Sequence, residues 1–159
     1  MPDELRHPTR EDDPYAWALA QARLLAKGES SLKNLDLKQL QHFLEEAAED
    51  MLAAVRSHLV NLMAHAAKAA YSSNPDIVGH WRSECVEFHD RLIAEYRPSM
   101  RRAIDIEKLW RRATRKVLAS FADYGEPRPD LPESCPFTLA ELVAEELDVE
   151  PLVAAVGRR

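Results

Sequence analysis

The feature that most limits the fold of this chain is a long stretch, Asp36 to Tyr71, that contains neither glycine nor proline. Its apolar residues recur every three or four positions, the spacing of one face of an α-helix. The series comprises Leu37, Leu40, Leu44, Ala48, Met51, Val55, Leu62 and Ala69. At about 1.5 Å per residue the predicted helix is roughly 50 Å long, longer than a small domain is wide. We therefore expect a central helix against which the other helices pack.

Capping and helix-breaking residues predict three further main helices and one short helix. The main helices are expected between Asp13 and Gly28, from about residue 76 to 96, and from a cap at Ser99 to Gly125. Thr138 followed by Glu141 has the pattern of a capping box, which predicts a short helix over TLAELVAEEL. Residues 126–136 hold four prolines and cannot be regular structure, so they form either a strap over the bundle or a tether.

Composition agrees with an all-α bundle. The chain has only four glycines, and its residues are 46% hydrophobic and 30% charged, as in ordinary globular proteins. We expect a flexible N-terminal arm over residues 1–12 and a single helical domain over residues 13–159, with the proline-rich segment inside it. No apolar run is long enough to cross a membrane. The polar N-terminus lacks a secretory signal, and two cysteines are too few for a disulfide scaffold, so we expect a cytoplasmic protein.

Charge is distributed unevenly along the chain. The whole chain carries −6, yet residues 97–116 hold eight basic residues against two acidic ones and so carry +6. The candidate anion-binding residues are Arg101, Lys108, Arg112, Arg115 and Lys116. Such a basic helix is suited to phosphate contacts. The alternative is that the acidic C-terminal third of the chain neutralises it.

Histidines and a cysteine on predicted helix faces were weighed as metal ligands. His58 and His65 continue the apolar series of the central helix, but seven residues separate them by about 10 Å, too far to share one ion. Cys85 and His89 lie one turn apart, at a spacing that permits a shared ion, but the sequence supplies no third or fourth ligand nearby. We interpret the histidines as partly buried groups bonded to neighbouring helices. No nucleophile motif or phosphate-binding loop is present, which disfavours an enzyme.

Several segments together resemble a known family. They are DPYAWALAQARLLAKG (13–28), LDLKQLQHFLEEAAEDM (35–51), HAAKAAY (65–71), Trp81 with Arg82, Pro98 with Ser99, and ESCPFTLAEL (133–142). In these segments the chain resembles the bacterial family called domain of unknown function 29. The resemblance implies a small all-helical bacterial protein and carries over no activity.

The sequence favours a non-enzymatic module that binds another protein or a second copy of itself, without a cofactor. The expected interface lies where the central helix outruns its neighbours, at Met63, Ala66, Ala67 and Ala70, because small residues allow close helix approach. One alternative is a nucleic-acid-associated regulatory module that uses the basic helix 97–116. A second is a metal-binding or enzymatic site around His65, Cys85 and His89.

Overall fold

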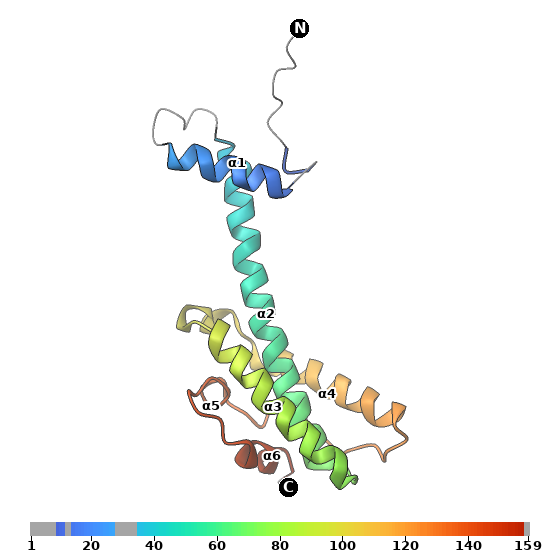
Figure 1. The fold of residues 1–159 in the computed structure, drawn as a ribbon. Coiled ribbons are helices and arrows are strands. Elements are labelled where there is room, and N and C mark those ends of the chain that lie inside the picture. The colour runs from blue at the N-terminus through green and yellow to red at the C-terminus, as the bar shows by residue number, and fades with distance from the viewer. Residues whose placement is uncertain (1–8, 12–13, 28–34, 158–159) are drawn as a thin grey trace. The chain divides into compact units, whose positions relative to one another are not determined.

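A computed structural model describes residues 9–11, 14–27 and 35–157 of the chain. The helices in these ranges are α1 (Pro14–Ala26), α2 (Leu37–Tyr71), α3 (Pro75–Glu95), the 3-10 helix η2 (Pro98–Ala103), α4 (Ile106–Asp123), α5 (Leu139–Leu142) and α6 (Val149–Gly157) (Figure 1). The described residues contain no strand, so the predicted all-α class and its long helix are confirmed. None of these helices has the length and apolar character that a membrane crossing requires.

The chain divides into two compact units, a first unit up to Glu49 and a second unit from Asp50 onward, and α2 contributes to both. We describe each unit by itself. Most of the expected N-terminal arm, residues 1–8 and 12, lies outside the described residues.

In the first unit, α1 packs on the first turns of α2 through an aromatic pair. Trp17 is buried, and its ring meets that of Phe43 edge-on, with centroids 5.8 Å apart. The Arg10 guanidinium lies 5.9 Å from the centroid of each of these two rings and pairs with Glu46. This small cluster fixes which face of α2 is covered by α1.

The start of α2 is set by a side-chain cap. The Asp36 carboxylate accepts a hydrogen bond from the backbone N–H of Gln39 at 3.1 Å. Buried Gln21 of α1 accepts a second bond from the backbone N–H of Asp36 at 3.0 Å. The cap therefore ties the two helices of the first unit together.

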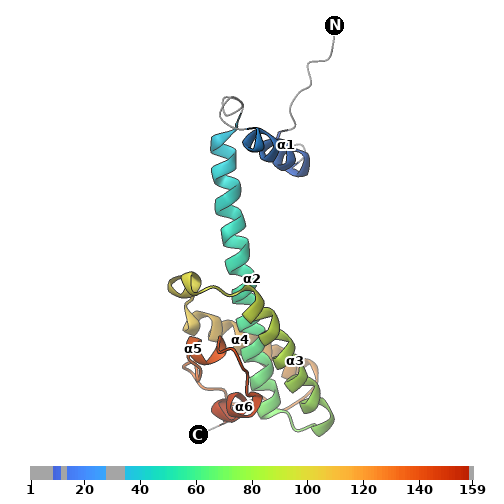
Figure 2. The same cartoon turned by 60° about the vertical axis from the view of Figure 1, so that its left-hand side comes forward.

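The core of the second unit surrounds the later turns of α2, which α3 and α4 both contact (Figure 2). The small side chains of α2 in this region permit close helix approach, and Trp110 and Leu92 fill the space between the helices. Met63, Ala66 and Ala67 are completely buried in this core, and Ala70 packs against it. The expected interface at these four residues was therefore misplaced: the chain's own helices already cover it.

The fourth predicted helix is in fact two elements. Pro98–Ala103 forms the 3-10 helix η2, and α4 begins only at Ile106. The Asp105 carboxylate caps α4 by accepting from the backbone N–H of Lys108 at 3.0 Å. The predicted cap at Ser99 was wrong because Asp105 offers a better-placed acceptor further along the chain. The expected start of α3 is confirmed: Asn74 accepts from the backbone N–H of Asp76 at 3.0 Å.

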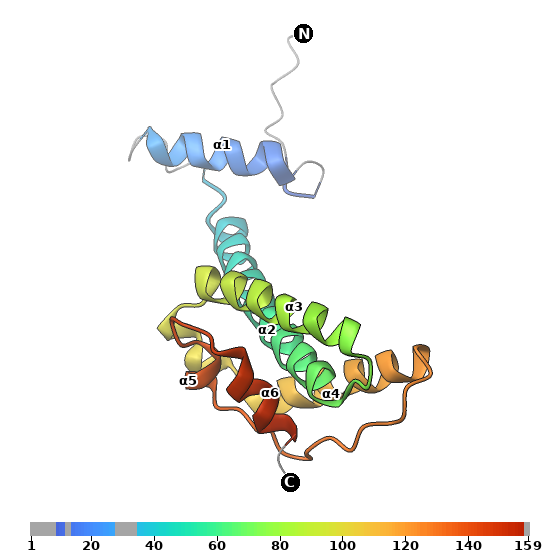
Figure 3. The same cartoon turned by 60° about the horizontal axis from the view of Figure 1, so that its bottom comes forward.

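The proline-rich segment is a strap and not a tether, because side chains of the bundle bind its backbone at successive points. Figure 3 shows this segment as the loop that follows α4. Trp110 Nε1–H donates to the carbonyl of Pro132 at 2.9 Å, and the Tyr71 hydroxyl donates to that of Asp130 at 2.8 Å. The Glu107 carboxylate accepts from the backbone N–H of Cys135 at 3.1 Å. A segment that cannot form its own ladder of hydrogen bonds is thus satisfied by its neighbours.

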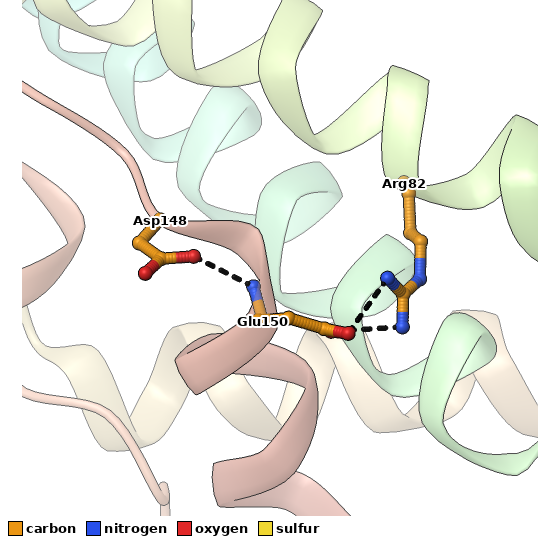
Figure 4. A network of polar contacts seen from close by, with 3 residues as sticks. All are labelled: Arg82, Asp148 and Glu150. Atoms are coloured by element: carbon orange, nitrogen blue, oxygen red, sulfur yellow. Dashed lines mark hydrogen bonds and ion pairs between the residues drawn. The ribbon is translucent and has the colours of Figure 1, made fainter.

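The C-terminal elements close the second unit. The capping box at Thr138 and Glu141 is present, but α5 extends only from Leu139 to Leu142, shorter than predicted. His89 of α3 donates through Nε2–H to the carbonyl of Ala144 at 2.9 Å, which holds the chain just after α5. Arg82 of α3 forms a salt bridge with Glu150 at 2.8 Å, in the first turn of α6 (Figure 4).

Candidate binding surfaces

An apolar series on α2 is exposed to solvent. Leu37, Leu44 and Met51 follow one another at seven-residue steps, and their side chains are 67%, 60% and 61% exposed. Leu37, Leu40, Leu44 and Ala48 also line a shallow apolar groove in the first unit. We call Leu37, Leu40 and Leu44, which all lie in the first unit, the leucine stripe. Large apolar side chains grouped in this way mark an interaction surface.

The leucine stripe is uncovered because α1 contacts a different face of α2. Phe43 and Glu46, which meet Trp17 and Arg10, lie about a quarter turn or more around the helix from Leu44. The sequence alone does not separate these faces, because Phe43 and Leu44 are adjacent in it.

A second candidate surface is a pocket in the second unit, which we call the basic pocket. It is lined by Arg56, Ala103, Asp105, Lys108, Leu109 and Arg112, and has a volume of about 240 Å³. The guanidinium of Arg56 donates to the carbonyl of Ala103 at 2.9 Å, so η2 is joined to α2 there. Three cations line the pocket against one carboxylate, that of Asp105, which also caps α4.

The predicted anion-binding residues are placed unequally. Lys108 and Arg112 line the basic pocket, while Arg101 lies on η2 and Arg115 is exposed on α4. Lys116 donates through Nζ to the Asn61 side-chain oxygen at 2.7 Å. The structure therefore brings two of the five residues into one pocket, together with Arg56 of α2, which sequence reasoning missed.

The acidic C-terminal third does not pair with this basic surface. Within the described part of the chain, no carboxylate forms an ion pair with Lys108, Arg112 or Arg115. Glu150 pairs with Arg82 of α3 instead, and Glu126 bonds to Ser72 at 3.3 Å. These two carboxylates therefore do not neutralise the basic helix directly, which was the alternative that the sequence left open.

His65 lies in a row of aromatic rings between α2 and α3. Its ring stacks on Phe88 with centroids 5.1 Å apart and meets Trp81 at 5.3 Å. Lys68 Nζ lies 4.4 Å from the Trp81 centroid. Burial lowers the pKa of His65, and the charge of nearby Lys68 acts in the same direction. The Nδ1–H of His65 donates to the Asn61 carbonyl at 2.7 Å, a bond within α2 and not to a neighbouring helix as predicted.

Residues considered for a metal site each have another role. His89 binds the Ala144 carbonyl, and the Cys85 thiol is fully buried, which raises its pKa to about 12. His58 Nε2 lies 3.2 Å from the Glu95 carboxylate of α3, as predicted for a histidine that contacts a neighbouring helix. The described ranges contain no cluster of three or more histidine, cysteine, aspartate or glutamate side chains that could hold a metal ion.

The lowered pKa of His65 predicts a loss of stability in acid. Above its ordinary pKa near 6.5 the imidazole is neutral in the folded and unfolded chain alike. As pH falls below that value, the unfolded chain binds a proton before the folded one does, so the free energy of unfolding decreases. The urea concentration at the midpoint of unfolding should therefore decrease as the pH is lowered from 7.5 to 5. In His65→Phe, which keeps an aromatic ring beside Phe88 and Trp81, this decrease should be smaller. His42→Gln, at an exposed histidine, is the control. If His42→Gln reduced the loss of stability in acid as much as His65→Phe, that loss could not be attributed to His65.

Comparison with known proteins agrees with this architecture. The sequence model of the family "Domain of unknown function DUF29" matches residues 10–147. The chain belongs to the DUF29 family. A crystal structure of an α-helical protein of unknown function from Rhodospirillum rubrum is similar to this DUF29 chain, with 26% sequence identity and a TM-score of 0.73. The alignment covers 96% of this chain and 99% of that one. No curated protein matches the sequence.

The leucine stripe of this DUF29 protein was visible in the sequence as an apolar series but was assigned to the bundle core. A signal that could have corrected this assignment was the difference in side-chain size between the first and the later turns of α2. Bulky Leu37, Leu44 and Met51 precede the small alanines that the second unit buries.

Proposed function

We propose that this DUF29 protein is a non-enzymatic module that binds a second copy of itself through the leucine stripe. The proposal rests on one observation: Leu37 and Leu44 lie seven residues apart on one helix and are each more than half exposed, with Leu40 between them. Seven-residue spacing of apolar side chains is the pattern by which helices pair in coiled coils. A second copy offers a surface of matching length and chemistry.

Charges beside the stripe favour an antiparallel pair. Lys38, Glu45 and Glu49 follow at spacings of seven and four residues and so share one flank of the stripe. In a two-fold antiparallel pair centred near Leu44, each flank meets the same flank of the other copy in reverse order. Lys38 of one copy then approaches Glu49 of the other, an attractive arrangement, while Glu45 lies near its own counterpart beside the two-fold axis.

A parallel pair lacks this complementarity. Its two-fold symmetry brings the flank with Glu45 and Glu49 against the opposite flank, where Phe43 and Asp50 lie. That opposite flank of residues 36–50 carries no basic side chain at helical spacing, and α1 already contacts Phe43. Like charges would therefore face each other across a parallel interface.

Light scattering after size exclusion, over a range of protein concentrations, tests the proposal. The wild-type chain should have twice its monomer mass of 18.1 kDa at high concentration. Leu37→Glu combined with Leu44→Glu should weaken dimerisation by at least about tenfold, since each buries a charge in the interface. Val86→Glu, at an exposed apolar residue on α3, is the matched control and should dimerise normally.

Charge reversal tests the orientation. Lys38→Glu alone should weaken the dimer, and so should Glu49→Lys alone. A mixture of the two variant chains should form a heterodimer in preference to either homodimer. A wild-type monomer at all concentrations, or an equal loss in Val86→Glu, would refute self-association through the stripe.

A further inference from the structure

The basic pocket lies in the second unit, and its properties point to a ligand that the leucine stripe does not explain. Arg56 of α2 and Lys108 and Arg112 of α4 present three cations around one cavity of about 240 Å³. The Asp105 carboxylate there already accepts the capping bond from the Lys108 backbone. Lys108 and Arg112 alone outnumber that carboxylate, and a cavity with this excess of positive charge attracts an anion.

Cations continue from the pocket along α4. Lys108, Arg112 and Lys116 follow at four-residue steps, about 6 Å of helix per step, so they lie near one face. Arg115 is exposed beside them and has no ion-pair partner among the residues the structure describes. A single small anion would bind only in the pocket. A ligand with several phosphates in a row would also contact Arg115 and Lys116 further along α4.

We propose that the basic pocket and the exposed cations of α4 bind the phosphate backbone of a nucleic acid without reading its sequence. Long, exposed lysine and arginine side chains suit phosphate contacts, which position a nucleic acid without specifying bases. This binding goes beyond the self-association proposed above and uses a different part of the chain.

A lipid surface fits these residues less well. A helix that lies on a membrane carries large apolar side chains that enter the lipid. The exposed large apolar residues of the described chain are Leu25, Leu37, Phe43, Leu44, Met51, Val86 and Tyr124. None of these exposed residues lies between residues 97 and 116, so the basic surface lacks the fully exposed, large apolar side chains of a helix that inserts into lipid.

Fluorescence anisotropy with a labelled 20-nucleotide single strand and the matching duplex tests the proposal. At 50 mM salt the full chain should bind, and affinity should fall as salt rises. With three phosphates neutralised, the slope of log K against log salt is about −2 for the single strand. The double variant Lys108→Glu, Arg112→Glu should bind at least about tenfold more weakly and show a slope smaller by about 1.4, because two phosphate contacts are lost.

Two further variants keep this test interpretable. Lys108→Gln with Arg112→Gln removes the charges without reversing them and should give an intermediate loss, with the helix content unchanged by circular dichroism. Arg128→Glu changes the net charge within the strap and should alter affinity by less than about threefold. Three outcomes would overturn the proposal: no binding at 50 mM salt, an equal loss in Arg128→Glu, or binding to phosphatidylserine vesicles but to neither oligonucleotide.

Discussion

Replacing Trp110 with alanine should lower the free energy of unfolding of the second unit by about 4 kcal/mol, the largest effect we expect from any single substitution in the chain. Its side chain is fully buried at the centre of the core, where it meets Phe137 edge-on with centroids 5.9 Å apart. Its indole N–H also holds the strap by donating to Pro132. Alanine therefore leaves a cavity and an unpaired carbonyl at once. Urea unfolding followed by circular dichroism measures the loss.

Two related variants separate these causes. Trp110→Phe keeps most of the apolar volume and removes the hydrogen bond, so it should cost about 1–2 kcal/mol and increase amide exchange in residues 130–135. Arg111→Ala, at the exposed neighbouring residue, should change the stability by less than about 0.5 kcal/mol. If Trp110→Ala lowered the free energy of unfolding no more than Arg111→Ala does, the strap and the core would not depend on Trp110 as described.

Both thiols should resist alkylation in the folded protein and react normally once it is unfolded. Burial raises the pKa of Cys85 from 9.0 to about 12 and that of Cys135 to about 11. Only the thiolate reacts, so at pH 8 both thiols should react at least about tenfold more slowly in the folded chain than in the unfolded one, and Cys85 the more slowly of the two. Steric exclusion at Cys85, which is completely buried, slows the reaction further.

A thiol-reactive dye at pH 8, with and without urea, checks this prediction. Cys135→Ser leaves Cys85 as the one thiol, so the two rates can be assigned separately. Rapid labelling of Cys85 in the folded Cys135→Ser variant would contradict its burial. It would also reopen the possibility of a functional thiol beside His89.

Much of the helical architecture could be predicted because it is encoded locally. The predicted capping box at Thr138 and Glu141 is a short-range pattern, and the structure contains it. The run without glycine or proline gave α2 almost to the residue. The start of α4 was missed because both Ser99 and Asp105 can cap a helix, and local sequence does not decide between two acceptors.

Which faces of each helix are buried by other helices could not be predicted, because burial depends on contacts between residues far apart in sequence. Periodicity showed that both ends of α2 are apolar, but not that α3 and α4 would bury the alanine-rich end in the second unit. Nor did it show that α1, in the first unit, would contact Phe43 and leave Leu37 and Leu44 exposed. The same reason explains the basic pocket. Arg56 meets Ala103 across 47 residues of chain, a contact for which no local pattern exists. The single domain expected over residues 13–159 stays a prediction.

The strap and α6 have a consequence for synthesis of the protein on the ribosome. The Tyr71 hydroxyl donates to the carbonyl oxygen of Asp130 and lies 3.3 Å from that of Val156. The side chains of Leu152 and Val156 complete the core. A nascent chain exposes the apolar side of α2 well before these later residues have emerged, at about 5–20 residues per second. The second unit therefore waits several seconds with an open core, and this interval is when chaperones have most access to it.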